Sequence, residues 1–157
     1  MKILIIGGTG IISSAVTDLL ADMNHTLYVL NRGRHNDSLK PSVTPFICDI
    51  NDKDTVTHLI DGLSFDCVID FTIQLPSEIH RDYSYFRENT KQFIFISSSC
   101  VYRRPLSCYQ VNEGTPVYNP YWDYALNKLA CEQELQTLFR TRHFPMTIIR
   151  PGHTYNE

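Results

Sequence analysis

The stretch that decides the fold is Ile3-Leu4-Ile5-Ile6-Gly7-Gly8-Thr9-Gly10-Ile11-Ile12-Ser13. Its first four residues form a short apolar run that glycine ends, and such a run predicts a buried strand. The glycines predict a tight turn. Apolar residues recur at the helical period from Ile11 to Met23, so a helix is expected directly after the turn. The stretch therefore predicts the first strand–turn–helix unit of an α/β domain.

The rest of the chain repeats this alternation of strands and helices. Further strands are predicted at Thr26 to Leu30, Val43 to Cys48, Cys67 to Phe71, Gln92 to Ile96 and Met146 to Ile149. Further helices are predicted at Asp52 to Ile60, Ser77 to Asn89 and Asp123 to Arg142. The alternation predicts an α/β fold: a Rossmann-type, doubly wound parallel sheet of about six strands with helices on both faces.

Composition limits the class of protein. The 157 residues suit a single domain spanning 1–157, and the net charge of −3 gives no electrostatic footprint for nucleic acid. No apolar run is long enough to cross a bilayer. The five cysteines are odd in number and scattered, so we expect no disulfide framework and no metal site. We read these thiols as buried and reduced in a cytoplasmic protein.

The glycine turn has the spacing expected of a pyrophosphate-binding loop. It reads either as Gly8-x-Gly10-x-x-Ser13 or as Gly7-x-x-Gly10-x-x-Ser13, and the sequence leaves both registers open. Glycines let the backbone approach a pyrophosphate closely, and the N-terminus of the following helix offers unpaired N–H groups to its charge. A ligand-free glycine turn is the lesser alternative, because the motif stands after the first strand of an alternating pattern.

The end of the second strand favours NADP over NAD. A carboxylate there would hold the adenosine ribose of NAD, but the sequence has Asn31 followed by Arg32 and Arg34. Arginine pairs with a 2′-phosphate that a carboxylate would repel. The alternative is that both arginines are solvated loop charges. Asp49, after the third strand, either accepts from the adenine amino group or caps a turn.

Tyr124 and Lys128 are separated by one helical turn, which places them on the same face of their helix. A nearby ammonium group stabilises a phenolate, so we expect Lys128 to lower the pKa of Tyr124 toward working pH. A serine cluster that includes Ser98 and Ser99 ends the fifth strand, where open α/β sheets build their sites. A serine hydroxyl there is placed to polarise a substrate oxygen.

In this order, the glycine turn, Ser97-Ser98-Ser99-Cys100-Val101-Tyr102, Tyr124-x-x-x-Lys128 and Ile149-Arg150-Pro151-Gly152 resemble the extended short-chain dehydrogenases/reductases, the NAD-dependent epimerase/dehydratase family. The resemblance implies that Ser98 (or Ser99, if the register slips by one), Tyr124 and Lys128 are catalytic. The cofactor-binding residues that it implies are Gly7, Gly8, Thr9, Gly10, Ile11, Ile12, Asn31, Arg32, Arg34, Asp49, Ile50, Phe71, Thr72, Lys128 and Pro151.

Family members continue well past the Arg-Pro segment, so the resemblance implies that this chain is the cofactor-binding part without the substrate-binding lobe. The short length would then mean a shortened chain, a proteolytic fragment or a degenerate gene product. Two functions are expected: an NAD(P)-dependent reductase, epimerase or dehydratase acting on a small nucleotide-sugar-like or other carbonyl substrate, or a non-catalytic NADP-binding module. The resemblance also makes a homodimer plausible.

Overall fold

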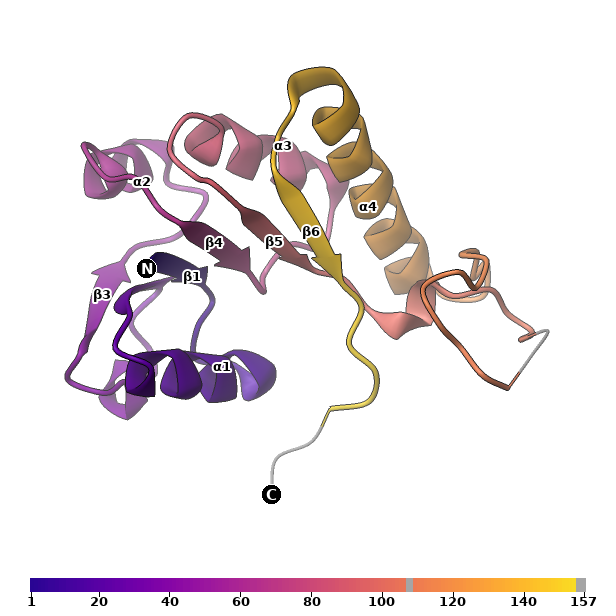
Figure 1. The fold of residues 1–157 in the computed structure, drawn as a ribbon, viewed down its shortest axis with the longest axis horizontal. Coiled ribbons are helices and arrows are strands. Elements are labelled where there is room, and N and C mark those ends of the chain that lie inside the picture. The colour runs from indigo at the N-terminus through magenta and orange to yellow at the C-terminus, as the bar shows by residue number, and fades with distance from the viewer. Residues whose placement is uncertain (107–108, 155–157) are drawn as a thin grey trace.

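Six parallel strands form one sheet in the order β3-β2-β1-β4-β5-β6 (Figure 1). The computed structural model describes residues 1–106 and 109–154. The strands are β1 (Lys2–Ile6), β2 (Thr26–Asn31), β3 (Val43–Ile47), β4 (Cys67–Asp70), β5 (Phe93–Ile96) and β6 (Met146–Ile149). This is the strand order of the Rossmann fold, whose ligands bind where the order reverses, beside β1 and β4. The predicted fold class is confirmed.

The helices lie on both faces of the sheet, as the alternating pattern predicted. They are α1 (Ile11–Asp22), α2 (Lys53–Ile60), α3 (Pro76–Phe86) and α4 (Asp123–Arg142), with short 3-10 turns η1 (Asn36–Ser38) and η2 (Ser99–Val101). In Figure 1, α1 lies on one side of the sheet, whereas α3 and α4 lie together on the other. The two core clusters agree with this arrangement, because α1 contributes to one, and α2, α3 and α4 to the other.

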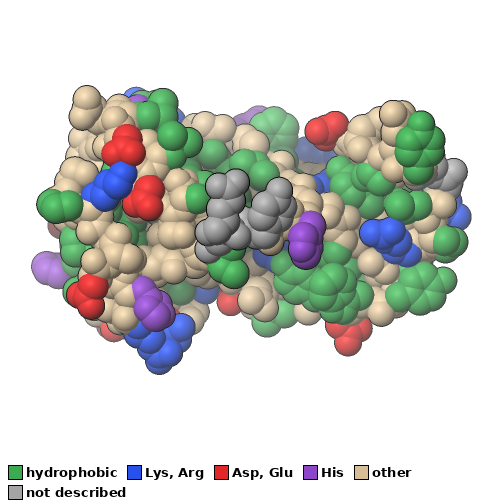
Figure 2. All heavy atoms as spheres, turned by 90° about the horizontal axis from the view of Figure 1, so that it is seen from below, with side chains coloured by type: hydrophobic (Ala, Val, Ile, Leu, Met, Phe, Trp, Pro, Cys, Tyr) green, Lys and Arg blue, Asp and Glu red, His purple; other side chains and the backbone are tan. Residues whose placement is uncertain are grey.

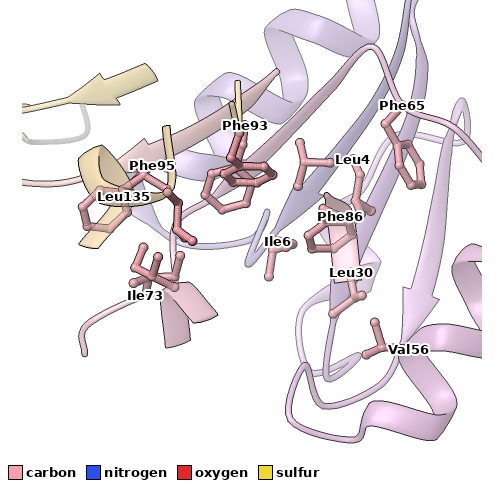
Figure 3. Packing of buried hydrophobic residues seen from close by; sticks show 14 of the residues in the cluster. Leu4, Ile6, Leu30, Val56, Phe65, Ile73, Phe86, Phe93, Phe95 and Leu135 are labelled. Atoms are coloured by element: carbon pink, nitrogen blue, oxygen red, sulfur yellow. The ribbon is translucent and has the colours of Figure 1, made fainter. Parts of the chain in front are cut away.

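The larger core cluster packs aromatic side chains between the sheet and the three helices on its face. Figure 3 shows Phe86 of α3 beside Leu4 and Ile6 of β1, with Phe93 and Phe95 of β5 nearby. All five side chains are fully or almost fully buried. Burying apolar area is the main favourable term in folding, so this cluster fixes where the strand ends, and the site they carry, come to lie.

Helix α1 buries only part of the face that its apolar period indicates. Of the apolar residues at this period, Val16 and Leu20 pack against the core, but Ala15 is exposed and the Leu19 side chain is 61% exposed. The buried residues are the small Ser13, Thr17 and Ala21. The reason is the close approach of α1 to the sheet: Thr17 Oγ1 donates to the Gly8 carbonyl at 3.0 Å, which leaves no room for larger side chains.

The ends of the elements differ from the predictions by a few residues at most, apart from the two unpredicted 3-10 turns. Asp52, predicted as the first residue of the second helix, precedes α2 as its N-cap and accepts from the Thr55 amide at 3.2 Å. The third helix is shorter than predicted: it ends at Phe86 rather than Asn89. Among the described residues, no helix is both long and apolar enough to span a membrane.

Candidate cofactor and catalytic site

The glycine turn joins β1 to α1 in a conformation that requires glycine at its first position. Gly7 has φ of +76°, and a Cβ on it would meet Thr72 Cγ2 at 2.5 Å. Ser13 Oγ donates to the Gly7 carbonyl at 2.6 Å and accepts from the Gly10 amide at 2.8 Å, so it closes the turn from inside the helix. The structure therefore supports the register Gly7-x-x-Gly10-x-x-Ser13 of the two that the sequence left open.

A cavity of about 360 Å³ opens beside this turn, at the carboxyl ends of β1 and β2. We call it the main cavity because of the residues that line it, not because of its size. It is lined by eight of the predicted cofactor-binding residues: Gly7, Thr9, Asn31, Arg32, Arg34, Asp49, Ile50 and Thr72. They come from four separate connections of the chain, and the fold brings them together as the sequence analysis expected.

Asn31 and the arginines form the outer part of the main cavity. Asn31 Oδ1 accepts from the Gly33 amide at 2.7 Å, which turns the loop after β2 and leaves the buried Nδ2 without an acceptor among the described residues. Arg32 and Arg34 are exposed, and neither forms an ion pair with the described part of the chain. An unpaired amide donor and two free guanidinium groups fit the ribose and phosphate of a dinucleotide.

Asp49 takes the capping role, one of the two roles that the sequence left open. Its Oδ1 accepts from both the backbone amide and the side-chain amide of Asn51, each at 2.9 Å, so it caps the turn after β3. The same residue lines the main cavity, next to Ile50. Its second carboxylate oxygen is therefore the one available to a ligand.

The other predicted cofactor-binding residues lie around the turn rather than in the wall of the cavity. Gly8 faces the sheet: a Cβ on it would meet Val29 Cγ1 at 2.9 Å, so it serves the close packing of α1. Ile11 is 62% exposed at the start of α1, with the half-buried Ile12 following. The half-buried side chains of Phe71 and Pro151 follow β4 and β6, and the Pro151 carbonyl accepts from the Ser99 amide at 2.9 Å.

Tyr124 and Lys128 share one face of α4, as their spacing predicted. The Lys128 Nζ lies 5.7 Å from the centroid of the Tyr124 ring. It donates to the carbonyl of Ile73, after β4, at 2.5 Å and to that of Ile96, at the end of β5, at 2.9 Å. Lys128 is only 3% exposed, so these two carbonyls hold the ammonium group at the middle of the sheet's carboxyl edge.

The expected lowering of the Tyr124 pKa is wrong for this structure. Burial, followed by the nearby Cys100 thiol, raises the pKa of Tyr124 above its usual value. Burial also lowers the pKa of Lys128, although Cys131 and Asp70 oppose that shift. The physical reason is that the Lys128 ammonium is bound by two carbonyl groups and lies beside the phenol ring rather than in contact with its hydroxyl.

The serines after β5 have distinct environments. Ser97 is buried, and its Oγ donates to Glu132 at 2.5 Å, so it is a structural residue. Ser98 is half-buried at the N-cap of η2, where its Oγ accepts from the Cys100 amide at 3.2 Å. Ser99 is also half-buried. Because η2 packs against α4 and its Cys100 lies close enough to Tyr124 to raise the tyrosine pKa, the segment that carries Ser98 and Ser99 adjoins Tyr124.

Exposed aromatic side chains border this end of the site. Figure 2 shows hydrophobic side chains gathered over the end of the molecule that carries the loop before α4. The exposed ones include Tyr118, Tyr121 and Trp122, and the Trp122 ring lies 5.1 Å from that of Tyr124. The predicted catalytic tyrosine therefore opens onto an aromatic rim.

Sequence analysis missed several residues of the main cavity: His35, Cys48, Asn51, Glu78 and Arg81. It also missed the buried acids Asp70 and Asp82 behind the cavity wall. One signal was present for Asp70, which ends an apolar strand at the edge where α/β sheets place their sites. Asp82 and Arg81 carry no such signal, because charged residues in an amphipathic helix are usually solvated. Within the described ranges, no group of three potential metal ligands is clustered.

The strand order, the glycine turn at the start of α1 and the cavity beside it define a Rossmann domain with the turn of a dinucleotide-binding protein. The chain belongs to the NAD dependent epimerase/dehydratase family, whose sequence model matches residues 3–91 and 81–157. No curated protein matches it closely enough to be reported as a relative.

Solved structures share this fold at low sequence identity. An epimerase from Methanothermobacter thermautotrophicus has 17% identity and a TM-score of 0.81, with 95% of this chain and 50% of that one covered. A UDP-Glc/GlcNAc 4-epimerase from Campylobacter jejuni has 22% identity and a TM-score of 0.81, with 95% and 52% covered. The enzyme WbmH of Bordetella bronchiseptica, solved with NAD+, has 20% identity, a TM-score of 0.70, and 95% and 55% covered. The chain spans about half the length of these structures.

Proposed function

We propose that this chain is the cofactor-binding and catalytic portion of an NAD(P)-dependent oxidoreductase, epimerase or dehydratase that acts on a carbonyl or hydroxyl substrate. The observation that carries the proposal is the joining of two sites at one sheet edge. The glycine turn and main cavity lie beside β1 and β2, and the Ser98, Tyr124 and Lys128 group lies beside β5. A dinucleotide lying along the carboxyl ends of the strands reaches from one to the other.

In this proposal the bound nicotinamide supplies or accepts a hydride, and the chain's own residues handle the proton. Tyr124 exchanges its phenolic proton with the substrate oxygen, while the Ser98 hydroxyl donates a hydrogen bond to the same oxygen. Lys128, fixed by the Ile73 and Ile96 carbonyls beside the Tyr124 ring, is placed to bind the nicotinamide ribose. Burial raises the Tyr124 pKa, so the phenol holds the proton that it gives to the substrate oxygen.

NADP is the preferred cofactor in this proposal. The exposed Arg32 and Arg34 line the main cavity without ion-pair partners in the described ranges, and Asn31 stands where NAD-binding domains carry a carboxylate. Arginine binds a phosphate with paired hydrogen bonds, whereas the ribose hydroxyl of NAD offers it no charge.

Titration of the chain with NADPH and NADH, followed by calorimetry or nicotinamide fluorescence, tests the cofactor proposal. Arg32→Ala is expected to weaken NADPH binding by about tenfold or more, the effect of one charged hydrogen-bonded contact, and to leave NADH binding nearly unchanged. Arg140→Ala, an exposed arginine of α4, is the matched control. Preference for NADH would refute the arginine argument, and binding of neither nucleotide would refute the cofactor site itself.

A binding module without catalysis is the second candidate, favoured by the raised pKa of Tyr124, which keeps the phenol protonated in this structure. Tyr124→Phe separates the two candidates. If the chain is an enzyme, the variant binds NADPH but loses oxidation or epimerisation of a UDP-sugar, whereas Tyr118→Phe, on the exposed rim, keeps it. UDP-sugars are the first substrates to try because several neighbours are named as UDP-sugar 4-epimerases.

The remaining proposals concern assembly and compartment. A homodimer through α3 and α4 is proposed because these helices lie side by side on one face of the sheet, where His80 Nε2 of α3 lies 3.2 Å from Glu134 Oε2 of α4. Sedimentation measures that state directly.

A cytoplasmic location is proposed from the free thiols of Cys48, Cys67, Cys100 and Cys131, of which Cys67 and Cys131 are buried. Cys108 lies outside the described residues.

A further inference from the structure

Two acidic side chains are buried behind the wall of the main cavity. Asp70 is the last residue of β4, and Asp82 lies in the second half of α3. Both are 0% exposed. Carboxyl groups are seldom fully buried unless they are paired, because burial of an unpaired carboxylate costs free energy. The surrounding groups must therefore compensate for the burial of Asp70 and Asp82.

Asp70 shapes the loop that follows β4. Its Oδ1 accepts from Thr72 Oγ1 at 2.7 Å, from the Ile73 amide at 3.3 Å and from the Thr72 amide. This loop touches both halves of the site. The Thr72 methyl group packs where a side chain on Gly7 would stand, and the Ile73 carbonyl receives the Lys128 ammonium at 2.5 Å.

Asp82 approaches Asp70 from the helix behind the loop. Its Oδ1 accepts from Arg81, whose Nε and Nη2 each lie at 2.8 Å. The Oδ2 atoms of Asp70 and Asp82 are both buried, and neither accepts a hydrogen bond from a described residue. Arg81 Nη2 lies 2.8 Å from Asp82 Oδ1 and 3.8 Å from Asp70 Oδ2, so the two carboxyl groups lie close together around one guanidinium group. Two buried carboxylates this close share a proton more readily than both ionise. The pKa of Asp82 is accordingly raised, by burial first and then by the charge and hydrogen bond of Asp70.

Arg81 connects the same pair to the main cavity. Its Nη1 donates to Asn51 Oδ1 at 3.0 Å, and its Nη2 lies 3.8 Å from Asp70 Oδ2. Both Arg81 and Asn51 line the cavity. Other ionisable groups near the pair are Glu78 and Tyr85 of α3 and Lys128 of α4.

We propose that Asp82 is a positioning residue: held by Arg81, its protonated carboxyl group donates to Asp70, and Asp70 keeps residues 70–73 in the shape that seats Lys128. Asp82 touches neither the main cavity nor Tyr124. It acts through two intermediates, the Asp70 carboxyl group and the Ile73 carbonyl. What Lys128 does when seated rests on the proposed function, but the seating itself does not.

The test measures the chemical reactivity of the Lys128 amine in the chain without nucleotide. Reductive methylation followed by peptide mass spectrometry gives the labelling rate of Lys128 relative to the exposed Lys53. Asp82→Ala is expected to raise this ratio by about fivefold to tenfold, the effect of losing about one hydrogen bond that holds the loop. Asp82→Asn is expected to leave the ratio near that of the wild type, because its amide donates to Asp70 and its oxygen accepts from Arg81.

Glu134→Gln is the control, since it removes another contact between α3 and α4 without touching the loop, and it should not change the ratio. If Asp82→Ala does not fold, Thr72→Val replaces it: this variant removes one bond to Asp70 and should raise the ratio by a smaller factor. Unchanged Lys128 labelling in the folded disruptive variant, or equal labelling in Asp82→Asn and Asp82→Ala, overturns the proposal. NADPH titrations of the same variants are read separately, so failure of cofactor binding is not mistaken for failure of the positioning.

Discussion

Gly7 shows how one residue without a side chain allows two parts of the site to meet. Its positive φ and its contact with Thr72 each exclude a Cβ, whereas Gly62 has φ of +66° with nothing within 4 Å of its would-be Cβ. Gly62→Ala should therefore cost only the backbone term, about 1–2 kcal/mol. Gly7→Ala should cost about 1–3 kcal/mol more, because overpacking is added. Urea unfolding of both variants measures the difference in the free energy of unfolding. Equal losses would show that the Thr72 side chain moves aside without destabilising the fold.

Asp82 makes stability depend on pH in a direction that its burial determines. In the unfolded chain it ionises near its usual pKa of about 4, whereas in the folded chain burial and Asp70 raise its pKa well above that value. Between the two pKa values the folded state binds more protons, so the free energy of unfolding falls as pH rises.

Asp82→Asn removes this titration. The stability of the variant relative to the wild type should therefore increase with pH above about 4, the unfolded-state pKa. Chemical unfolding at a series of pH values checks this, with Asp52→Asn, the exposed helix cap, as a control for general effects of losing a carboxylate. Parallel profiles for Asp82→Asn and the wild type would contradict the protonated state assigned to Asp82.

At the scale of elements, a buried ion pair joins β6 to α4. Glu132 of α4 is 1% exposed. Its carboxylate accepts hydrogen bonds from Arg150, just after β6, through Nε at 2.9 Å and Nη2 at 2.7 Å, and from Ser97, just after β5. Removing one partner of such a pair leaves the other buried and unpaired. Glu132→Ala should therefore cost about 3–5 kcal/mol.

The control for that prediction is an exposed pair at the opposite end of the sheet, Lys91 with Asp66 at 2.7 Å. Lys91→Ala should have a much smaller effect than Glu132→Ala, because solvent screens the exposed pair. Thermal unfolding ranks the two variants. A loss for Glu132→Ala no larger than that for Lys91→Ala would mean that Arg150 finds water or another acceptor when Glu132 is absent.

Elements were easier to predict than the faces they bury. The strands and helices follow from apolar runs and glycines, which are local signals. The buried face of α1 does not, because Leu19 fits the apolar period yet lies outward, while Ser13 and Thr17 are inside. That choice depends on how closely the helix approaches Gly8, which is a tertiary distance. In α4, the place of Lys128 on the face of Tyr124 was expected from its motif, but the burial of Glu132 depends on Arg150, which lies beyond the end of the helix.

Across the whole molecule, the candidate site was predictable where a motif encodes it and hidden where the fold assembles it. The glycine turn, Asn31, Arg32 and the Tyr124–Lys128 pair were all found from spacing. Arg81 and Asp82 were not predicted, because their roles come from their proximity to Asp70 in the folded chain. The direction of the Tyr124 pKa was wrong for the same reason, since the fold buries the phenol and the carbonyls that hold Lys128 come from the loop after β4 and the end of β5.

The last prediction concerns the chain as one cooperative unit. Its six strands form a continuous sheet with a core cluster on each face, so residues 1–157 should unfold in one transition with far- and near-ultraviolet circular dichroism changing together. NADPH binds only the folded form in this view, and at a hundred times its Kd it should add about 2.7 kcal/mol. Arg32→Ala should reduce the gain from NADPH but not that from NADH at equal concentrations. If the far- and near-ultraviolet transitions did not coincide, the two halves of the sheet, to either side of the β1–β4 contact, would fold separately. The main cavity would then be stable even when the loop and strand that hold Lys128 are unfolded.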